Sequence, residues 1–232
     1  MSKFISSEID VQHLSDLRAE LNAGDSTNQN RITEILYALQ DFKEELLPNE
    51  KDEILRLVDP DGNNRNLRAP RWLCHLLGLR HRSVHIILQW QSPGLGKVFI
   101  LQVRSWNKFD SPGQLDISVG GHLVGDMDKL EAAYREMEEE LGITIEHLKS
   151  GRLVYREGYE ISEKQEENNF FNTEWRDIYR GEISTESFNQ IRFNDNEVVG
   201  MYLCPESQAQ NLLNQKIIPI ASALRDSLPL CL

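Results

Sequence analysis

The chain has 232 residues, of which 40% are hydrophobic and 27% are charged, a composition that is typical of a folded domain and argues against global disorder. Its 37 acidic and 25 basic residues give a formal net charge of −12, which argues against general electrostatic binding to nucleic acid or to an anionic membrane surface. A polyanionic small molecule would therefore need locally placed positive charge, which divalent metal ions supply in many sites.

The N-terminal segment MSKFISSEID lacks the long apolar core of a signal peptide, and no run approaches the roughly 20 apolar residues that cross a bilayer. The three cysteines, Cys74, Cys204 and Cys231, are widely spaced and form no CxxC motif. This pattern favours buried thiols in a reducing compartment over disulfides or zinc ligands. We therefore expect a cytoplasmic protein with no membrane partner.

Residues 8–57 have helical character, because apolar residues recur at helical spacing in two stretches around Leu17 and Ile35. The segment GDSTNQN between these stretches has the composition of a loop. We therefore expect a helical hairpin over residues 1–57, ahead of a main domain over residues 58–232. Because the hairpin has no cluster of catalytic residue types, its expected role is packing or dimerisation, which is compatible with a homodimer.

The next segment, LVDPDGNNRNLRAPRW, is rich in turn residues and is expected to link the hairpin to the main domain. After it, VHIILQW and KVFILQV are rich in branched and aromatic residues and are separated by SPGLG, which predicts two antiparallel strands joined by a turn. Further strands are expected at residues 153–155, 175–183 and 198–203, and one or two helices after Pro205. Strands interrupted by a strong helix, then more strands and terminal helices, predict a mixed α/β or α+β domain.

The helix inside this domain has well-specified ends. Asp128 and Glu131 have the spacing of a capping box, and Gly142 suits the left-handed position at a helix C-terminus. Several apolar residues fall within one stripe that can pack on the sheet, namely Leu130, Ala133, Tyr134, Met137 and Leu141. The pattern predicts a helix from about 128 to 142 with one apolar face.

Glu136, Glu139 and Glu140 share a different arc of this helix, because positions three and four residues apart are neighbours on a helix surface. Three adjacent carboxylates repel one another unless a cation lies among them. Carboxylate oxygens on a rigid helix suit Mg²⁺ or Mn²⁺, with substrate phosphate and water completing the coordination. Arg135 lies one turn from Glu139 and can orient a carboxylate by a charge-assisted hydrogen bond.

The segment SVGGHLVGDMDKLEAAYREMEEELGI resembles the Nudix box, in which a glycine and an upstream glutamate precede the run Arg-Glu-apolar-x-Glu-Glu-x-Gly-apolar. Residues 135–143 match that run at every specified position. Gly121 takes the place of the leading glycine, but Met127 replaces the upstream glutamate, and its thioether is too soft to bind Mg²⁺. The adjacent Asp126 is a candidate substitute.

The resemblance implies a Nudix fold, a mixed β-sheet sandwiched between helices, with the N-terminal helices as an extension. It also implies metal-dependent hydrolysis of a diphosphate linkage in a nucleoside diphosphate derivative or a similar small molecule, with Mg²⁺ or Mn²⁺ as cofactor. Metal ligation falls on Glu136, Glu139, Glu140 and the backbone carbonyl of Gly121. The catalytic residues are these glutamates and Arg135, with either Glu136 or Glu140 as the base.

A second resemblance lies ahead of the box. The stretch KVFILQVR ends in Arg104, and Lys108 follows four residues later before Pro-Gly, which is similar to the Nudix subgroup related to isopentenyl-diphosphate isomerase. In those isomerases the matching pair holds diphosphate, and an arginine fork with a lysine point charge suits that ligand. Glu197 matches a position where many Nudix proteins carry an acid near the substrate. The resemblance therefore implies substrate binding by Arg104, Lys108 and Glu197.

Two other functions remain as hypotheses. The isomerases carry an essential cysteine just before the box, but the corresponding stretch DISVGGHL contains none, so hydrolysis is favoured over isomerisation. A Nudix-fold ligand-binding or regulatory module without catalysis is suggested by Met127, and the complete run REMEEELGI argues against it.

His81, Arg82 and His85 precede or begin the first strand of the main domain. His122 follows the paired glycines of the box. A lone histidine is more often a structural residue than a ligand, so these four residues are only minor candidates for the site.

Overall fold

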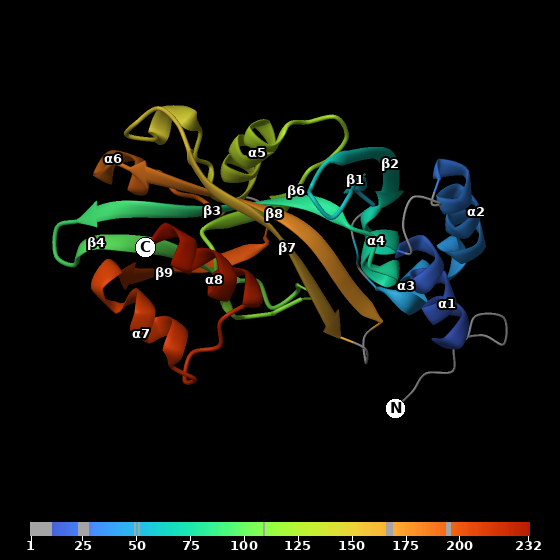
Figure 1. Cartoon of the computed structure of the whole chain (residues 1–232). Helices are drawn as coiled ribbons and strands as arrows, with labels where there is room; N and C mark the ends of the chain where they lie inside the picture. The colour runs from blue at the N-terminus through green and yellow to red at the C-terminus, as the bar shows by residue number, and fades with distance from the viewer. Residues whose placement is uncertain are drawn as a thin grey trace. The chain divides into compact units, whose positions relative to one another are not determined.

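The structure of this chain is a computed structural model (Figure 1), and it describes residues 11–22, 28–48, 50, 52–108, 110–165, 169–193 and 196–232. These residues form two units. The first draws on residues 1–82, 123–126 and 159–175, and the second on residues 83–122, 127–158 and 176–232. Three strands contribute residues to both units, β3 (His81–Ser92), β7 (Val154–Gln165) and β8 (Phe170–Ile183). Within the described ranges, no helix is both long and apolar enough to cross a bilayer.

The first unit begins with the predicted pair of helices. The helical elements are α1 (Val11–Asn22), α2 (Gln29–Leu39), η1 (Gln40–Phe42) and α3 (Lys43–Leu46). The side chain of Asn28 caps α2 by accepting a hydrogen bond from the backbone N–H of Arg31 at 3.0 Å. The apolar stripes are buried, with Leu14, Leu17 and Leu21 on α1 and Ile32, Ile35 and Leu39 on α2. The expected helical start at residue 8 and residues 24–27 of the expected loop lie outside the described residues, whereas Gln29 and Asn30, also expected in the loop, form the start of α2.

The helical character expected up to residue 57, and the linker expected after it, are wrong. Ile54–Val58 forms strand β1, which pairs antiparallel with β2 (Asn64–Pro70), and α4 (Arg71–Leu77) follows at once. Asp59 closes the turn between these strands, because its carboxylate accepts two backbone N–H bonds at 2.9 and 2.8 Å. The turn residues of this segment therefore mark a β-hairpin instead of a linker, and the division at residue 57 stays a prediction.

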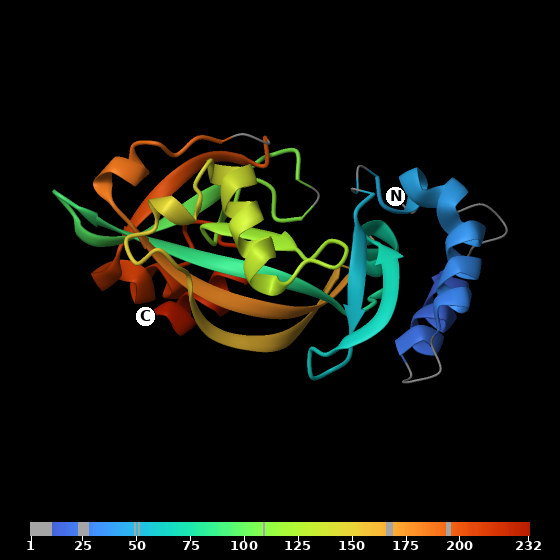
Figure 2. The ribbon, with the colours of Figure 1, turned by 90° about the horizontal axis from the view of Figure 1, so that it is seen from above.

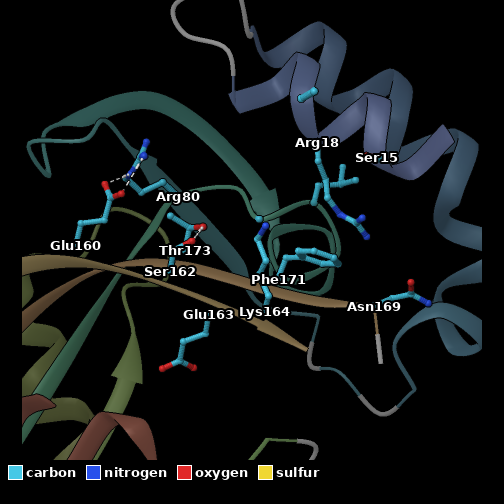
Figure 3. A pocket seen from close by; sticks show the side chains of 13 residues that line it. Ser15, Arg18, Arg80, Glu160, Ser162, Glu163, Lys164, Asn169, Phe171 and Thr173 are labelled. Atoms are coloured by element: carbon cyan, nitrogen blue, oxygen red, sulfur yellow. Dashed lines mark hydrogen bonds and ion pairs between the residues drawn. The ribbon is translucent and has the colours of Figure 1, made fainter. Parts of the chain in front are cut away.

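A pocket with a volume of about 590 Å³ lies in the first unit (Figure 3). One wall is α1, whose Arg18 donates a hydrogen bond to the carbonyl of Leu76 at 2.8 Å. The guanidinium of Arg18 also lies 3.5 Å from the centroid of the Phe171 ring, within the range of a cation–π contact. Arg80 and Glu160, which also line the pocket, form an ion pair. Arg18 therefore ties the N-terminal helix to β8 and α4 of this unit.

The second unit is built on an antiparallel arrangement of strands. Its further strands are β4 (Gly96–Arg104), β5 (Leu115–Asp116), β6 (Val119–His122) and β9 (Val198–Pro205). The predicted hairpin is confirmed, because β3 and β4 pair antiparallel around the SPGLG turn. Strand β6 also pairs with β3, whereas β5 and β9 pair with β4. The strands predicted near residues 153, 175 and 198 are confirmed as parts of β7, β8 and β9.

Helices lie on both faces of this sheet, with α5 on one side and α7 and α8 on the other (Figures 1 and 2). The helical elements are α5 (Lys129–Leu141), η2 (Ile145–His147), α6 (Thr185–Phe188), η4 (Glu206–Gln208), α7 (Ala209–Asn214), α8 (Ser222–Ser227) and η5 (Leu228–Cys231). The core between them includes Val84, Phe99, Val119 and Met137, all fully buried. The predicted α+β architecture and its closing helices are therefore confirmed. Cys74, Cys204 and Cys231 are buried thiols, as predicted.

Candidate active site

Both ends of α5 are fixed by the residues that the sequence indicated. The carboxylate of Asp128 caps the first turn by accepting hydrogen bonds from the backbone N–H groups of Leu130 at 2.7 Å and Glu131 at 3.0 Å. At the other end Gly142 has a φ of 66°, a left-handed conformation that glycine adopts without strain, and its N–H bonds to the carbonyl of Glu138 at 3.0 Å. The register of the carboxylate-bearing helix is thus set by local interactions.

The apolar face of α5 differs from the prediction at one position. Ala133, Met137 and Leu141 are buried as expected and Tyr134 is half-buried, but Leu130 is 38% exposed and Ala132 is fully buried in its place. The helical period of 3.6 residues does not by itself predict which side of α5 is buried. The packing of α5 against β6 decides which side chains are covered.

The three predicted metal-binding glutamates lie in two different environments. Glu136 and Glu140 are buried, with exposed fractions of 8% and 3%, whereas Glu139 is exposed. Burying a carboxylate costs free energy unless a cation or hydrogen bonds compensate for lost hydration. Arg135 forms an ion pair with Glu136 and lies 3.6 Å from Glu139. Arg135 is therefore placed to orient these carboxylates, as the sequence suggested.

Gly121 on β6 lies directly against the carboxylate of Glu136. A Cβ atom at this position would be 2.0 Å from Cδ of Glu136 and 2.3 Å from its Oε1, far closer than nonbonded atoms approach. Strand β6 is held there by its antiparallel pairing with β3, in which Gly121 lies opposite Val84. Only a residue without a side chain lets the strand backbone and the Glu136 carboxylate come this close.

Replacing Gly121 by alanine is expected to displace the Glu136 carboxylate and to lower metal-dependent turnover by at least tenfold. Because the obstructed atoms are at the end of a flexible side chain, the free energy of unfolding should fall by only about 1 kcal/mol. Steady-state kinetics and urea unfolding measure the two effects. The matched control is Gly200→Ala on β9, where a new Cβ would make only an ordinary contact of 3.9 Å with Val103. Equal turnover in the two variants would contradict the prediction.

Asp126, the candidate substitute for the upstream glutamate, is engaged with other residues. Its carboxylate lies 2.6 Å from Arg68 and 3.4 Å from Arg56 in the first unit. Since it is already paired with two arginines and largely exposed, nothing in these contacts favours a metal-binding role for Asp126.

The predicted substrate-binding residues are brought together by strand pairing in the second unit. Arg104 ends β4, opposite Val198 at the start of β9, and this register places Glu197 beside the segment after Arg104. The backbone N–H of Ser105 donates to the carbonyl of Glu197 at 2.8 Å, and Lys108 forms an ion pair with the Glu197 carboxylate. Lys108 and Glu197 are thus partners in an ion pair. Their separation of 89 residues in the chain means that the sequence alone does not predict this contact.

Arg104 is also held by protein groups. It donates to the carboxylate of Asp116 at 2.8 Å and to the carbonyl of Asp110 through two nitrogens at 3.1 and 3.0 Å. Asp116 is buried on β5, and burial raises the pKa of its carboxyl group, although the positive charge of Arg104 opposes that shift. The sequence interpretation missed Asp116. An acid among the branched apolar residues of LDISV, near a strand that ends in arginine, was the available signal.

The glutamates of α5 carry the kind of donor atom that a hard divalent cation takes. Glu136 and Glu140 are one turn apart and both are buried, while Arg135 is the cation in contact with Glu136. Oxygen donors on a rigid helix are the ligands that Mg²⁺ and Mn²⁺ prefer. Ligation by these residues, and by the carbonyl of Gly121, remains a prediction.

Comparison with known proteins shows one consistent family. The model of the NUDIX domain matches residues 79–225. Nudix hydrolase 3 of Arabidopsis thaliana is 35% identical over 94 residues, which are 40% of this chain and 12% of that protein. An uncharacterized Nudix hydrolase of Yersinia pestis is 34% identical over 106 residues, which are 45% of this chain and 56% of that protein. Both alignments span less than two thirds of the relative's length.

A solved structure supports the fold. The crystal structure of a protein from Deinococcus radiodurans superimposes with a TM-score of 0.57 at 20% sequence identity. The match covers 77% of this chain and 99% of that chain. At this identity the likeness concerns the fold alone, and it agrees with the α+β architecture described above.

Proposed function

We propose a function for this chain on the basis of its family. The chain belongs to the NUDIX family, whose model matches residues 79–225. The proposed activity is hydrolysis of a diphosphate linkage, with Mg²⁺ or Mn²⁺ as cofactor, in a nucleoside diphosphate derivative or a similar small molecule. The observation that carries the proposal is the burial of Glu136 and Glu140 on one face of α5, with Gly121 packed against the Glu136 carboxylate. This arrangement supplies oxygen atoms of the kind that hard divalent cations prefer as ligands.

In the proposed mechanism Glu136, Glu139 and Glu140 hold the metal, and Arg135 keeps Glu136 in position through their ion pair. A divalent cation held by these residues would supply positive charge to the phosphate oxygens and would lower the pKa of a water molecule that it binds. Either Glu136 or Glu140 accepts the proton of that water as it attacks phosphorus. The burial of both carboxylates strengthens these interactions, because the local dielectric is lower than that of water.

On the substrate side, Lys108 and Arg104 are proposed to hold the diphosphate. Lys108 would exchange the carboxylate of Glu197 for phosphate oxygens, so Glu197 keeps the lysine in place before substrate binds. Arg104 is already bonded to Asp116 and to the carbonyl of Asp110. Arg104 would therefore have two roles in substrate binding. It would place positive charge near the phosphates, and it would position the segment between residues 105 and 116.

The isomerase hypothesis gains no support from the cysteines of the chain. Cys204 and Cys231 are buried, and burial raises the pKa of each thiol to about 11, while burial also raises the pKa of Cys74. Thiols in such surroundings stay protonated near neutral pH and are poor acids, bases or nucleophiles. Hydrolysis therefore remains the proposed reaction.

A substrate screen tests the proposal. The purified chain would be incubated with nucleoside diphosphates and triphosphates, nucleotide sugars, dinucleotides, thiamine diphosphate and isopentenyl diphosphate, with Mg²⁺, Mn²⁺ or a chelator. We expect mass spectrometry to show cleavage of at least one class only when metal is present, and solvent ¹⁸O to enter the product phosphate. The Glu139→Gln variant serves as the blank. Isomerisation of isopentenyl diphosphate, or tight ligand binding without turnover in any class, would contradict the proposal.

A further inference from the structure

Two histidines and a glutamate are gathered in the interior of the first unit. His75 lies on α4, His81 begins β3 and Glu174 lies on β8, and their exposed fractions are 2%, 0% and 5%. Their ligand atoms all lie within 4.8 Å of one another. Imidazole nitrogens and carboxylates are the ligands of zinc and related transition metals. Three elements distant in sequence therefore converge on a donor set that differs from the glutamates of α5.

Hydrogen bonds orient both imidazole rings with Nε2 as the acceptor atom. Nδ1 of His81 lies 2.9 Å from the carbonyl oxygen of Leu79, which can only accept, so Nδ1 carries the proton. Nδ1 of His75 lies 3.2 Å from the carboxylate of Glu50, which Arg71 in turn holds in an ion pair at 3.0 Å. In a neutral imidazole whose Nδ1 donates, Nε2 is the unprotonated nitrogen, and an unprotonated nitrogen is the form that binds a metal ion. Metal-binding histidines are typically held in this way, by a carboxylate or a backbone carbonyl.

The distance between His81 and Glu174 also suits a shared metal ion. Nε2 of His81 is 3.7 Å from Oε1 of Glu174, which is longer than a normal hydrogen bond. Two atoms bound to one zinc ion at about 2.0–2.1 Å in a tetrahedron are roughly 3.3 Å apart. The observed separation needs only a small contraction to reach that value. The ligand atom of His75 lies within 4.8 Å of those of His81 and Glu174, so this second histidine is close enough to share the same ion.

The geometry points to a transition-metal site, best suited to Zn²⁺, formed by His75 Nε2, His81 Nε2 and the carboxylate of Glu174. Glu50 and the carbonyl of Leu79 are positioning groups that hold the two rings. Three protein ligands leave a coordination position for water or a further donor. Because the ligands come from α4, β3 and β8, the bound metal would join these elements and stabilise the first unit. The site is independent of the proposed hydrolysis, since it uses neither the residues nor the hard metal assigned to α5.

Metal titration of the full chain tests this inference. Metal-free protein would be titrated with Co²⁺ and then Zn²⁺ in excess Mg²⁺, which occupies oxygen sites but competes poorly for imidazole. We expect one equivalent of Co²⁺ to give the intense visible bands of four-coordinate cobalt, and Zn²⁺ to displace it and to raise the thermal unfolding midpoint. Glu174→Gln should weaken Zn²⁺ binding at least tenfold, and Glu50→Gln about 10- to 100-fold.

The control is His13→Asn, which alters an exposed histidine on α1 of the same unit and should leave Zn²⁺ binding unchanged. Absorption spectroscopy at the zinc edge of the wild-type protein keeps the inference testable if a ligand variant fails to fold. Scattering from two imidazole rings is expected. No uptake of Zn²⁺ or Co²⁺ in excess Mg²⁺, or a zinc shell of oxygen atoms only, would overturn the inference.

Discussion

Replacing Glu140 by glutamine is expected to lower metal-dependent turnover on the order of 100- to 1,000-fold, with Glu139→Gln showing a similar loss. Glutamine has nearly the same shape but no charge, so it removes a metal ligand or base without leaving a cavity. Since Glu140 is only 3% exposed, the thermal unfolding midpoint of the variant must be measured beside its turnover, so that a loss of catalysis is distinguished from a loss of folding. Turnover as a function of Mg²⁺ concentration, together with the thermal unfolding midpoint, measures both effects.

The same helix offers a matched control for this comparison. Glu138 is exposed and occupies the unspecified position between Met137 and Glu139, so Glu138→Gln changes the same charge without touching the proposed ligands. Its turnover should stay within about twofold of the wild-type value. If Glu139→Gln and Glu140→Gln both retained the wild-type rate, the metal chemistry could not lie on α5. A loss of rate that higher Mg²⁺ concentrations restore would identify the altered residue as a metal ligand.

Replacing Arg104 by alanine is expected to lower the free energy of unfolding by about 3–5 kcal/mol, because it leaves the buried carboxylate of Asp116 without its cation. Two hydrogen bonds to the carbonyl of Asp110 are lost as well. Urea unfolding measures the change. Lys97→Ala is the control on the same strand, since Lys97 pairs with Glu206 at the surface and should contribute about 0–1 kcal/mol. Equal destabilisation by the two substitutions would show that Arg104 has no structural role.

The pH dependence of the Arg104→Ala variant supplies a second measurement. Burial raises the pKa of Asp116 above its ordinary value, so the folded chain binds this proton more tightly than the unfolded chain. The contribution of Asp116 to stability is therefore greatest below the unfolded pKa and is lost as pH rises through the folded pKa. Without Arg104 the opposing charge is gone, and the loss should extend to higher pH. Asp116→Asn in the same background should abolish that added pH dependence.

The features that follow from local sequence were predicted well. The ends of α5 depend on Asp128 and Gly142, whose side-chain cap and left-handed backbone act within one helical turn. The β3–β4 hairpin likewise follows from two branched, apolar runs and the short turn between them. The run from 135 to 143 predicts neighbouring carboxylates because residues on a single helix have fixed spacing. Residues 54–70 were misassigned because a short apolar run has the same appearance in a strand and in a helix. In the folded chain these residues are strands because β1 pairs with β2.

Contacts between residues that are distant in the chain could not be predicted from the sequence, because they arise from strand register and packing. The close approach of Gly121 to Glu136 requires β6 to lie under α5, and the pairing of Lys108 with Glu197 requires β9 to lie beside β4. His81 looked like a lone structural histidine until α4 and β8 placed His75 and Glu174 around it. Local hydrogen bonds and helical periodicity act over a few residues and can be read along the chain. Burial and charge pairing depend on which surfaces meet, and only the folded chain decides that.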